Sequence, residues 1–160
     1  MSTYPEECPV AATLDAVGDR WTLLVVRDLL RGIRRYADLQ RSLAPIAPNL
    51  LADRLRRLED LGLVTREVYS ERPLRAEYHL TERGHALAPV IVTIGRFGID
   101  VLGRPEPDYL AAHVGCGGRV PPTAWRCLRC GDDVTAGELE LLPPAEILPA
   151  AGGVSAASTG

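Results

Sequence analysis

Four side chains that could bind metal or undergo redox chemistry lie close together in HVGCGGRVPPTAWRCLRCG, residues 113–131. His113 and Cys116 are separated by two residues, as are Cys127 and Cys130, and a glycine follows each pair. A two-residue spacer lets both side chains of a pair turn toward one ion, and the glycine permits a tight turn beneath it. Three thiolates and an imidazole would complete a closed tetrahedral zinc site, which is structural rather than catalytic.

Two other interpretations of this segment stay open. Cys127 and Cys130 could remain reduced or form a disulfide, with His113 an ordinary surface residue, or the segment could be a cysteine-rich loop without either role. A redox Cys-x-x-Cys pair normally follows a strand at a helix start, and no βαβ pattern precedes this one. The segment is short and polar, so a bound ion would help to order it. The spacing therefore favours a structural zinc.

The remaining sequence shows no pattern typical of an enzyme. It contains no Ser/His/Asp set, no phosphate-binding loop and no paired acids, so we expect no catalytic residues. No run approaches the roughly 18 apolar residues of a membrane span, and the N-terminus MSTYPEEC lacks the layout of a secretory signal. We expect a cytoplasmic chain that does not enter a membrane, which argues against structural disulfides.

The charge distribution is uneven along the 160 residues. The chain has a net charge of −3, and its 18 positive side chains are all arginine. Residues 20–75 nevertheless carry 12 arginines against seven acidic residues, which gives this segment a net charge of +5. A locally basic segment is what nucleic-acid binding requires, because phosphate contacts supply much of the affinity.

Hydrophobic spacing predicts four helices in the first 61 residues. Residues 8–32 indicate two helices separated near Gly18, with Asp19 capping the second and Gly32 ending it. A short helix is expected within residues 35–43. Pro48 then begins a helix whose apolar positions fall on one face and should pack inward. These positions are Leu51, Leu55, Leu58 and Leu61.

The next segment predicts a hairpin and a long helix. Residues 63–69 and 76–80 have the composition of strands, and the connection between them carries Arg72 and Arg75. Thr81 should cap a helix that runs to about Leu102 and bends at Pro89. The apolar seam of this helix is larger than one small domain needs to cover, so we expect it to form a dimer surface. Its members are Leu87, Val90, Ile91, Ile94, Phe97, Val101 and Leu102.

This order of elements predicts a mainly α fold with a small β-hairpin wing, the winged helix-turn-helix. In this fold an exposed helix enters the major groove, and the hairpin reaches the neighbouring backbone or minor groove. Side-chain chemistry suggests base contacts at the helix that begins at Pro48, and backbone contacts before the short helix and at the hairpin tip. The residues are Arg35, Tyr36, Asn49, Leu50, Asp53, Arg54, Arg57, Arg72 and Arg75.

Three longer motifs resemble the HxlR-type transcriptional regulators. They are CPVAATLDAVGDRWTLLVVRDLLRG, RRYADLQRSLAPIAPNLLADRLRRLEDLGLV and YHLTERGHAL, and together they cover about residues 8–102. The resemblance implies a homodimer, held by the first and last helices of the domain, that binds a pseudo-palindromic operator. It places the recognition helix at Asn49 to Arg57 and the wing at Arg72 to Arg75.

Cys8 matches a cysteine that some members of this family use to sense electrophiles or oxidants. A helix N-terminus lowers the pKa of a thiol, whereas the neighbouring Glu6 and Glu7 would act in the opposite direction. The alternative interpretation is a small buried residue at the start of a helix. Both interpretations stay open.

We therefore expect a DNA-binding and dimerisation domain at residues 8–103, a zinc-ribbon-like extension at 104–148, and a disordered tail at 149–160. The expected function is sequence-specific transcriptional regulation by a homodimer on a double-stranded DNA operator. The alternatives are a redox-sensing repressor that uses Cys8, and a zinc-ribbon module for protein interaction. No pattern indicates a particular small-molecule effector.

Overall fold

The computed structural model describes residues 8–72, 74–107, 109, 111, 115–116, 125–134 and 136–139. The chain divides into two compact units, residues 1–110 and 111–160, which we describe separately. Within the described residues, no helix is long and apolar enough to cross a membrane. His113 and the expected tail at 149–160 lie outside this description.

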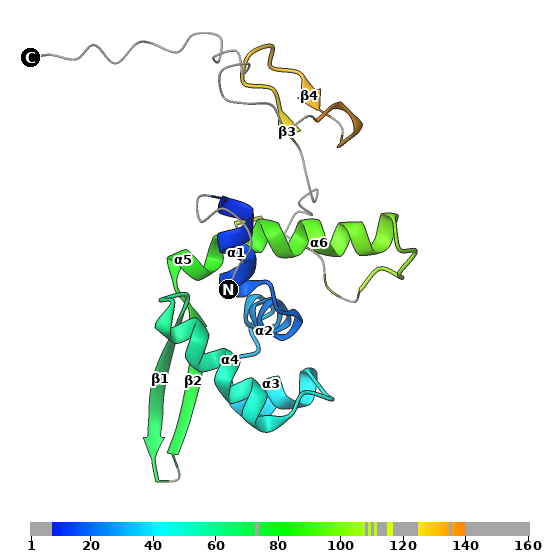
Figure 1. Ribbon diagram of the computed structural model, residues 1–160. Helices are drawn as coiled ribbons and strands as arrows, with labels where there is room; N and C mark the ends of the chain where they lie inside the picture. The colour runs from blue at the N-terminus through cyan, green and yellow to red at the C-terminus, as the bar shows by residue number, and fades with distance from the viewer. Residues whose placement is uncertain are drawn as a thin grey trace, which may run out of the picture. The chain divides into compact units, whose positions relative to one another are not determined.

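The first unit is mainly helical and contains one hairpin (Figure 1). Its elements are α1 (Pro9–Val17), α2 (Arg20–Leu30), α3 (Tyr36–Ser42), α4 (Pro48–Asp60), β1 (Val64–Glu71), β2 (Leu74–Leu80), α5 (Glu82–His85) and α6 (Ala88–Asp100). The two strands are antiparallel, with Val64 opposite Leu80, and their register shifts between Val68 and Ser70. Before α3, Arg35 forms an isolated bridge to Glu77, which ties the α2–α3 connection to the hairpin.

The core lies between α2, α3, α4 and the start of β1. Helix α2 contributes Val25, Val26 and Leu29, which are at most 6% exposed. The inner face of α4 was predicted correctly in its main part, because Leu51, Leu55 and Leu58 are all buried in the same cluster. Leu61 follows the last residue of α4 as its C-cap and is half-buried. Other buried members of the cluster are Leu39, Leu43, Ile46 and Val64.

Sequence signals at three helix starts act as expected. The carboxylate of Asp19 accepts hydrogen bonds from the amides of Trp21 and Thr22, both at 3.1 Å, and thereby caps α2. Pro48 begins α4, where a missing N–H costs no intrahelical bond. The hydroxyl of Thr81 accepts from the amide of Gly84 at 3.1 Å and caps α5.

The helix expected from residue 82 to about 102 is in fact two helices. Helix α5 ends at His85 and α6 begins at Ala88, with Pro89 in its first turn. Proline lacks the N–H that a continuous helix would need at this position but is well suited to a first turn. The bend that we predicted at Pro89 is therefore a complete break, placed just before it.

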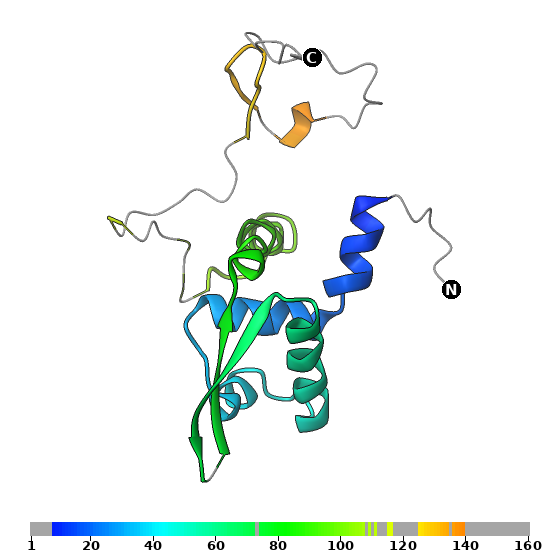
Figure 2. The same ribbon diagram turned by 90° about the vertical axis from the view of Figure 1, so that its left-hand side faces the viewer.

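The helices lie on two sides of α2. In Figures 1 and 2, α1, α5 and α6 lie on one side of α2, whereas α3 and the tip of the β1–β2 hairpin lie on the other. On the first side, α6 has no buried residue. Leu87 and Ile91 still pack against the core, but Ile94 and Phe97 are 51% and 55% exposed.

The second unit contains short elements. Strands β3 (Trp125–Arg126) and β4 (Asp133–Val134) pair antiparallel, with Trp125 opposite Val134. A 3₁₀ turn follows at Ala136–Glu138. The connection between the two strands carries Cys127 and Cys130.

Candidate nucleic-acid interface

Helix α4 presents a polar face on the side opposite its buried leucines. Asn49, Asp53 and Arg56 are exposed and are spaced four and three residues apart, so they share one stripe of the helix. A guanidinium nitrogen of Arg56 lies 3.1 Å from Oδ1 of Asp53, and these side chains are 68% and 55% exposed. An exposed ion pair of this kind is weak and leaves both groups accessible to other partners. We call Asn49, Asp53 and Arg56 the α4 polar stripe.

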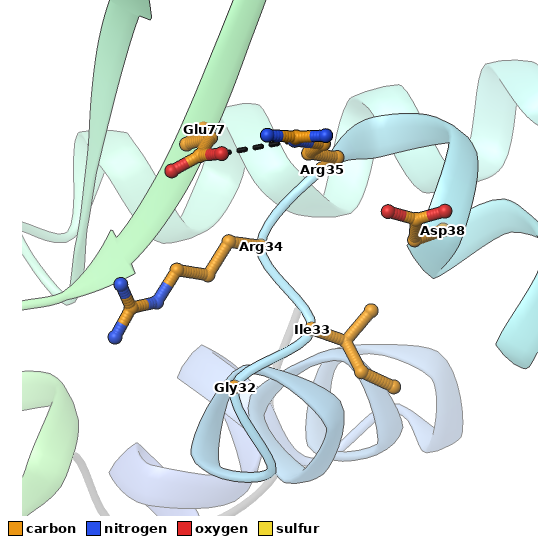
Figure 3. A pocket seen from close by; sticks show the side chains of 6 residues that line it. All are labelled: Gly32, Ile33, Arg34, Arg35, Asp38 and Glu77. Carbon is orange, nitrogen blue, oxygen red and sulfur yellow. Dashed lines mark hydrogen bonds and ion pairs between the residues drawn. The ribbon is translucent and has the colours of Figure 1, made fainter.

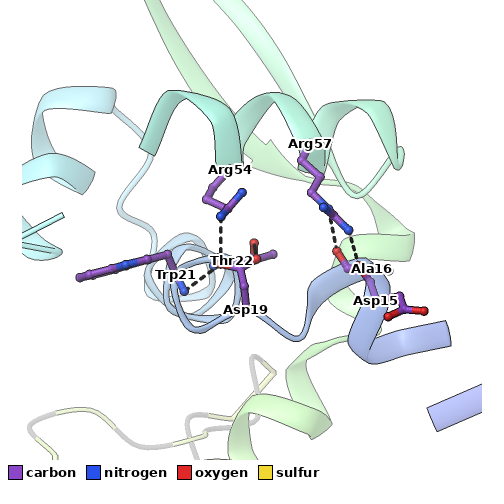
Figure 4. Close-up of polar contacts among 7 residues, drawn as sticks. All are labelled: Asp15, Ala16, Asp19, Trp21, Thr22, Arg54 and Arg57. Atoms are coloured by element: carbon purple, nitrogen blue, oxygen red, sulfur yellow. Dashed lines mark hydrogen bonds and ion pairs between the residues drawn. The ribbon is translucent and has the colours of Figure 1, made fainter. Parts of the chain in front are cut away.

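Two arginines that we predicted as DNA contacts on α4 have partners within the protein. Nε of Arg54 donates to Oδ1 of Asp19 at 2.9 Å. Nε of Arg57 donates to the carbonyl oxygen of Ala16 at 3.0 Å, and its Nη2 donates to the carbonyl oxygen of Asp15. Figure 4 shows both side chains pointing from α4 toward the junction of α1 and α2.

Leu50 and Tyr36, also predicted as contacts, support the start of α4. Leu50 is half-buried and packs against the core. The hydroxyl of Tyr36 donates to the carbonyl oxygen of Pro48 at 2.7 Å. Partial burial raises the pKa of Tyr36, so its hydroxyl remains a donor at neutral pH. Tyr36 therefore holds the first turn of α4 in place.

Arg35 lies against the middle of the hairpin. Its Nε donates to Oε1 of Glu77 at 2.9 Å, and its guanidinium carbon lies 5.5 Å from the ring centroid of Tyr69. The hydrogen bond to Glu77 is the main cause that raises the pKa of Arg35, and the nearby Tyr69 raises it further. The Arg35 side chain is 59% exposed despite these contacts, so part of its guanidinium faces solvent.

A shallow hollow of about 430 Å³ lies beside Arg35 (Figure 3). It is lined by Gly32, Ile33, Arg34, Arg35, Asp38 and Glu77, so its charges are mixed. Arg34 is exposed and forms no ion pair with any described residue. Arg34 and Arg56 were not among the predicted contact residues, although the excess of arginine in residues 20–75 includes both.

The hairpin carries free cations at its tip. Arg72 occupies the turn after β1, and Arg75 stands in β2 opposite Ser70. Both are exposed, and in the described part of the chain neither forms an ion pair. Nearer the base of the hairpin, Nε2 of His79 lies 3.6 Å from Glu67 and 3.8 Å from Glu77. Arg66, nearer the base, is exposed as well, so two of the three arginines of the hairpin lie at its tip.

Cys8, the predicted redox residue, stands at the N-cap of α1. It is half-buried, is not in a disulfide, and its side chain makes no capping hydrogen bond. It lies at the end of α1 opposite to the two carbonyl oxygens that Arg57 binds.

The predicted metal ligands are only partly described. Cys127 and Cys130 are free thiols in a tight turn, in which the amide of Gly131 donates to the carbonyl oxygen of Cys127 at 2.9 Å. Gly131 has a φ of 80°, which favours glycine. Hydrogen bonds from the backbone amides of Cys130 and Arg129 lower the pKa of the Cys127 thiol. Among the described residues, which include Cys116 but not His113, no three His, Cys, Asp or Glu side chains are placed to hold a metal ion.

Comparison with known proteins identifies the family. A sequence model of the HxlR-like helix-turn-helix proteins matches residues 16–105. The chain belongs to the HxlR-like helix-turn-helix family. The resemblance seen in the sequence motifs is therefore confirmed, and the chain is a DNA-binding transcriptional regulator of the helix-turn-helix type.

Individual relatives extend the match beyond the family region. The HTH-type transcriptional regulator MT3179 of Mycobacterium tuberculosis is 42% identical over 128 residues, which are 79% of this HxlR-like chain and 80% of MT3179. The solved structure of PA1607, named as a transcription factor, has a TM-score of 0.70 at 35% identity and covers 86% of this chain and 95% of its own. The structure of the redox regulator HypR in its reduced form has a TM-score of 0.56 at 35% identity, and the match covers 60% of this chain and 98% of the HypR chain.

Proposed function

We propose that the chain acts as a homodimer that regulates transcription by binding a pseudo-palindromic DNA operator. The observation that carries this proposal is the α4 polar stripe, which is exposed on a helix of the winged domain. The hairpin of this domain ends in two exposed arginines that form no ion pair with any described residue. A major groove admits one α-helix, and cations at a hairpin tip suit the adjacent phosphates.

The α4 polar stripe provides the base contacts in this proposal. Asn49 can form two hydrogen bonds with an adenine edge, Arg56 can bind O6 and N7 of guanine, and Asp53 can accept from the amino group of cytosine. Arg56 replaces Arg54 and Arg57, which we had predicted for this role, because their donors are directed to α1 and α2. Leu50 faces the core and is not assigned a base contact.

Phosphate contacts come from arginines around the stripe. Arg72 and Arg75 lie at the hairpin tip, and Arg34 and Arg35 lie where the α2–α3 connection meets the middle of the hairpin. Arg35 keeps part of its guanidinium exposed while Glu77 fixes its orientation. These contacts would position the protein without reading sequence.

The dimer surface is formed by exposed apolar residues on α1 and α6. Val10 and Leu14 of α1 are 66% and 59% exposed, and α6 and its end expose Ile94, Phe97 and Val101. This surface, which we call the α1/α6 apolar face, lies on the side of α2 away from α3 and the hairpin tip. Two copies joined there would be free to present both α4 helices to half-sites about 34 Å apart.

A footprint on duplexes selected from a random pool, and on the region upstream of the protein's own gene, tests this proposal. We expect protection of two half-sites separated by one helical turn, resistant to competitor DNA and weakened by salt. Protection of a single half-site at saturating protein would contradict action as a dimer. Failure to select any sequence would contradict specific DNA binding.

We also propose that Cys127 and Cys130 bind a structural zinc ion together with Cys116 and His113, the last of which lies outside the described residues. The turn from Cys127 to Gly131 supports this, because it places both thiols on one short loop that is closed by the hydrogen bond from the amide of Gly131 to the carbonyl oxygen of Cys127. A short two-residue spacer followed by glycine in a positive-φ turn is typical of structural zinc knuckles. No residue of this unit whose burial is described is buried, so zinc would supply the cross-link that a core otherwise provides.

Metal analysis of the purified full chain tests the zinc site. We expect about one zinc per chain in the wild-type protein, and loss of zinc in Cys127→Ser and Cys130→Ser. The Cys8→Ser variant is the control and should keep its zinc. Equal zinc in wild type and Cys127→Ser, or none in the wild type, would contradict the site.

Control of DNA binding by oxidation of Cys8 is a second candidate function. Cys8 is a free thiol at the start of a helix that carries exposed apolar residues, and a redox regulator, HypR, is among the similar structures. Peroxide would oxidise the thiol to a sulfenic acid and be reduced to water. We expect peroxide to change operator affinity in the wild type and not in Cys8→Ser. An equal response in both proteins would exclude Cys8 as the sensor.

A further inference from the structure

Helix α4 is attached to the end of α1 by a side chain. The last carbonyl groups of an α-helix have no partner within the helix. Two of these groups in α1, those of Asp15 and Ala16, accept hydrogen bonds from the guanidinium of Arg57 on α4. A cation at this end also interacts favourably with the helix dipole. Arg57 therefore caps α1 from a residue 41 positions away in the sequence.

One turn earlier on α4, Arg54 is attached to the beginning of α2. Its Nε donates to Oδ1 of Asp19, the same carboxylate that caps α2 through Trp21 and Thr22. The Arg54 side chain is 25% exposed and that of Asp19 is 35% exposed. The pair is therefore partly shielded from solvent, and α4 is bound on both sides of the α1–α2 junction (Figure 4).

Helix α1 has few other attachments. Val17 is the single buried residue among its nine residues, all of which are described, and Val10 and Leu14 are exposed. The junction itself is tight, because a Cβ on Gly18 would lie 2.4 Å from the carbonyl oxygen of Leu14. A displacement of α1 would thus be carried to α4 by Arg57 rather than absorbed by a loose connection.

We infer that Arg57 and Arg54 are positioning residues that couple helix α1 to helix α4, so that a change at α1 alters the affinity for DNA. This inference rests on the proposed function, in which α4 enters the major groove. It assigns a regulatory role to α1, whose exposed face and Cys8 are available to a partner copy or to a reagent. It also explains why two arginines of the recognition helix are directed away from DNA.

Replacement of Arg57 by methionine tests the inference, with Arg56→Met as the matched control. Methionine keeps the length of the aliphatic part and removes the donors. For Arg57→Met we expect about tenfold weaker DNA binding with an unchanged dependence of log K on log salt, because no phosphate contact is lost. For Arg56→Met we expect a change in base preference, because Arg56 contacts a guanine edge in the proposed function. A slope reduced in Arg57→Met would contradict the inference.

A double-mutant cycle with Gly18→Ala tests the coupling itself. The alanine must displace the last turn of α1, where the acceptors of Arg57 lie. We expect Arg57→Met to have little further effect on DNA affinity in the Gly18→Ala background. The fold-loss in affinity of the double variant should therefore be smaller than the product of the fold-losses of the two single variants. Multiplying effects would show that Arg57 acts independently of α1.

Hydrogen exchange measured without DNA separates this inference from the proposed function. Arg57→Met should increase amide exchange in residues 9–17, whereas Arg56→Met should leave it unchanged. If this result is obtained but the wild type binds no DNA, the attachment stands and the proposed function fails. If exchange in α1 is the same in all three proteins, the attachment is absent and the inference fails even where DNA binding is intact.

Discussion

At the scale of single residues, Asp19 does more than cap α2, which is the only role that the sequence predicted for it. Its carboxylate caps α2, accepts from the hydroxyl of Thr22 and pairs with Arg54 of α4. Burial alone would raise the pKa of Asp19, but the hydrogen bonds from Thr22 and the charge of Arg54 outweigh it. The pKa therefore lies below the usual value of 3.8.

This lowered pKa predicts a pH-dependent contribution to stability. A carboxylate whose pKa is lower in the folded state stabilises the fold above its unfolded pKa and loses that effect as the pH falls through its folded pKa. Asp19→Asn retains a capping oxygen but no charge, so we expect it to lower the free energy of unfolding by about 1 kcal/mol at neutral pH. Urea unfolding should show this difference in full above pH 3.8 and a decreasing difference below it. A difference that is constant with pH would contradict the assignment.

At the scale of elements, α4 and the hairpin were predictable because their signals are local. The spacing of Leu51, Leu55 and Leu58 gives the buried face of α4, and the strand composition on both sides of Arg72 gives the hairpin. The roles of Arg54 and Arg57 were not predictable. Their acceptors lie 35 to 42 residues earlier, and two of them are backbone carbonyls that no residue type reveals.

The break between α5 and α6 and the predicted zinc site show the same limit. Pro89 is compatible with both a bend and a helix start, and only the packing of Leu87 and Ile91 against the core decides between them. For Cys127 and Cys130 the spacing predicted the turn, while joining Cys116 to them requires contacts that are not local.

The hairpin gives a prediction at the scale of this element. Arg72 and Arg75 are exposed at its tip and form no ion pair within the described part of the chain, so replacing both by alanine should remove two phosphate contacts without changing the folded domain. We expect the slope of log K against log salt to decrease by about two. Arg96→Ala is the control, because Arg96 pairs with Asp100 on α6 and should leave the slope unchanged. Fluorescence anisotropy over a series of salt concentrations measures both, and equal slopes in all proteins would exclude the hairpin from the interface.

At the scale of the whole molecule, the α1/α6 apolar face is the surface through which we propose that two chains associate. Phe97 is 55% exposed on α6, Ile94 lies about one turn before it on the same helix, and Val101 follows the last residue of α6. Large exposed apolar surfaces of this kind typically mark protein interfaces. The face is formed by elements separate from α3 and the hairpin, so its disruption should leave each winged domain folded.

We therefore expect Phe97→Asp to convert the protein to a monomer that retains its helical circular dichroism. A charge placed in an apolar interface would have to be desolvated without a partner. Sedimentation equilibrium measures the change, and Leu128→Asp is the control, since Leu128 is 82% exposed but belongs to the second unit. If Phe97→Asp remains a dimer, the interface lies elsewhere.

The central claim is that α4 reads DNA through its polar stripe, and one binding measurement tests it most directly. Wild-type protein and an Asn49→Ala/Arg56→Ala variant are titrated against the selected operator in the presence of excess competitor DNA. Both substituted side chains are exposed, so the variant should unfold at the same temperature as the wild type. We predict specific binding by the wild type and a loss of at least about 100-fold in the variant, because each good base contact is worth about 1–3 kcal/mol. Equal affinity of the two proteins for the operator would contradict the claim.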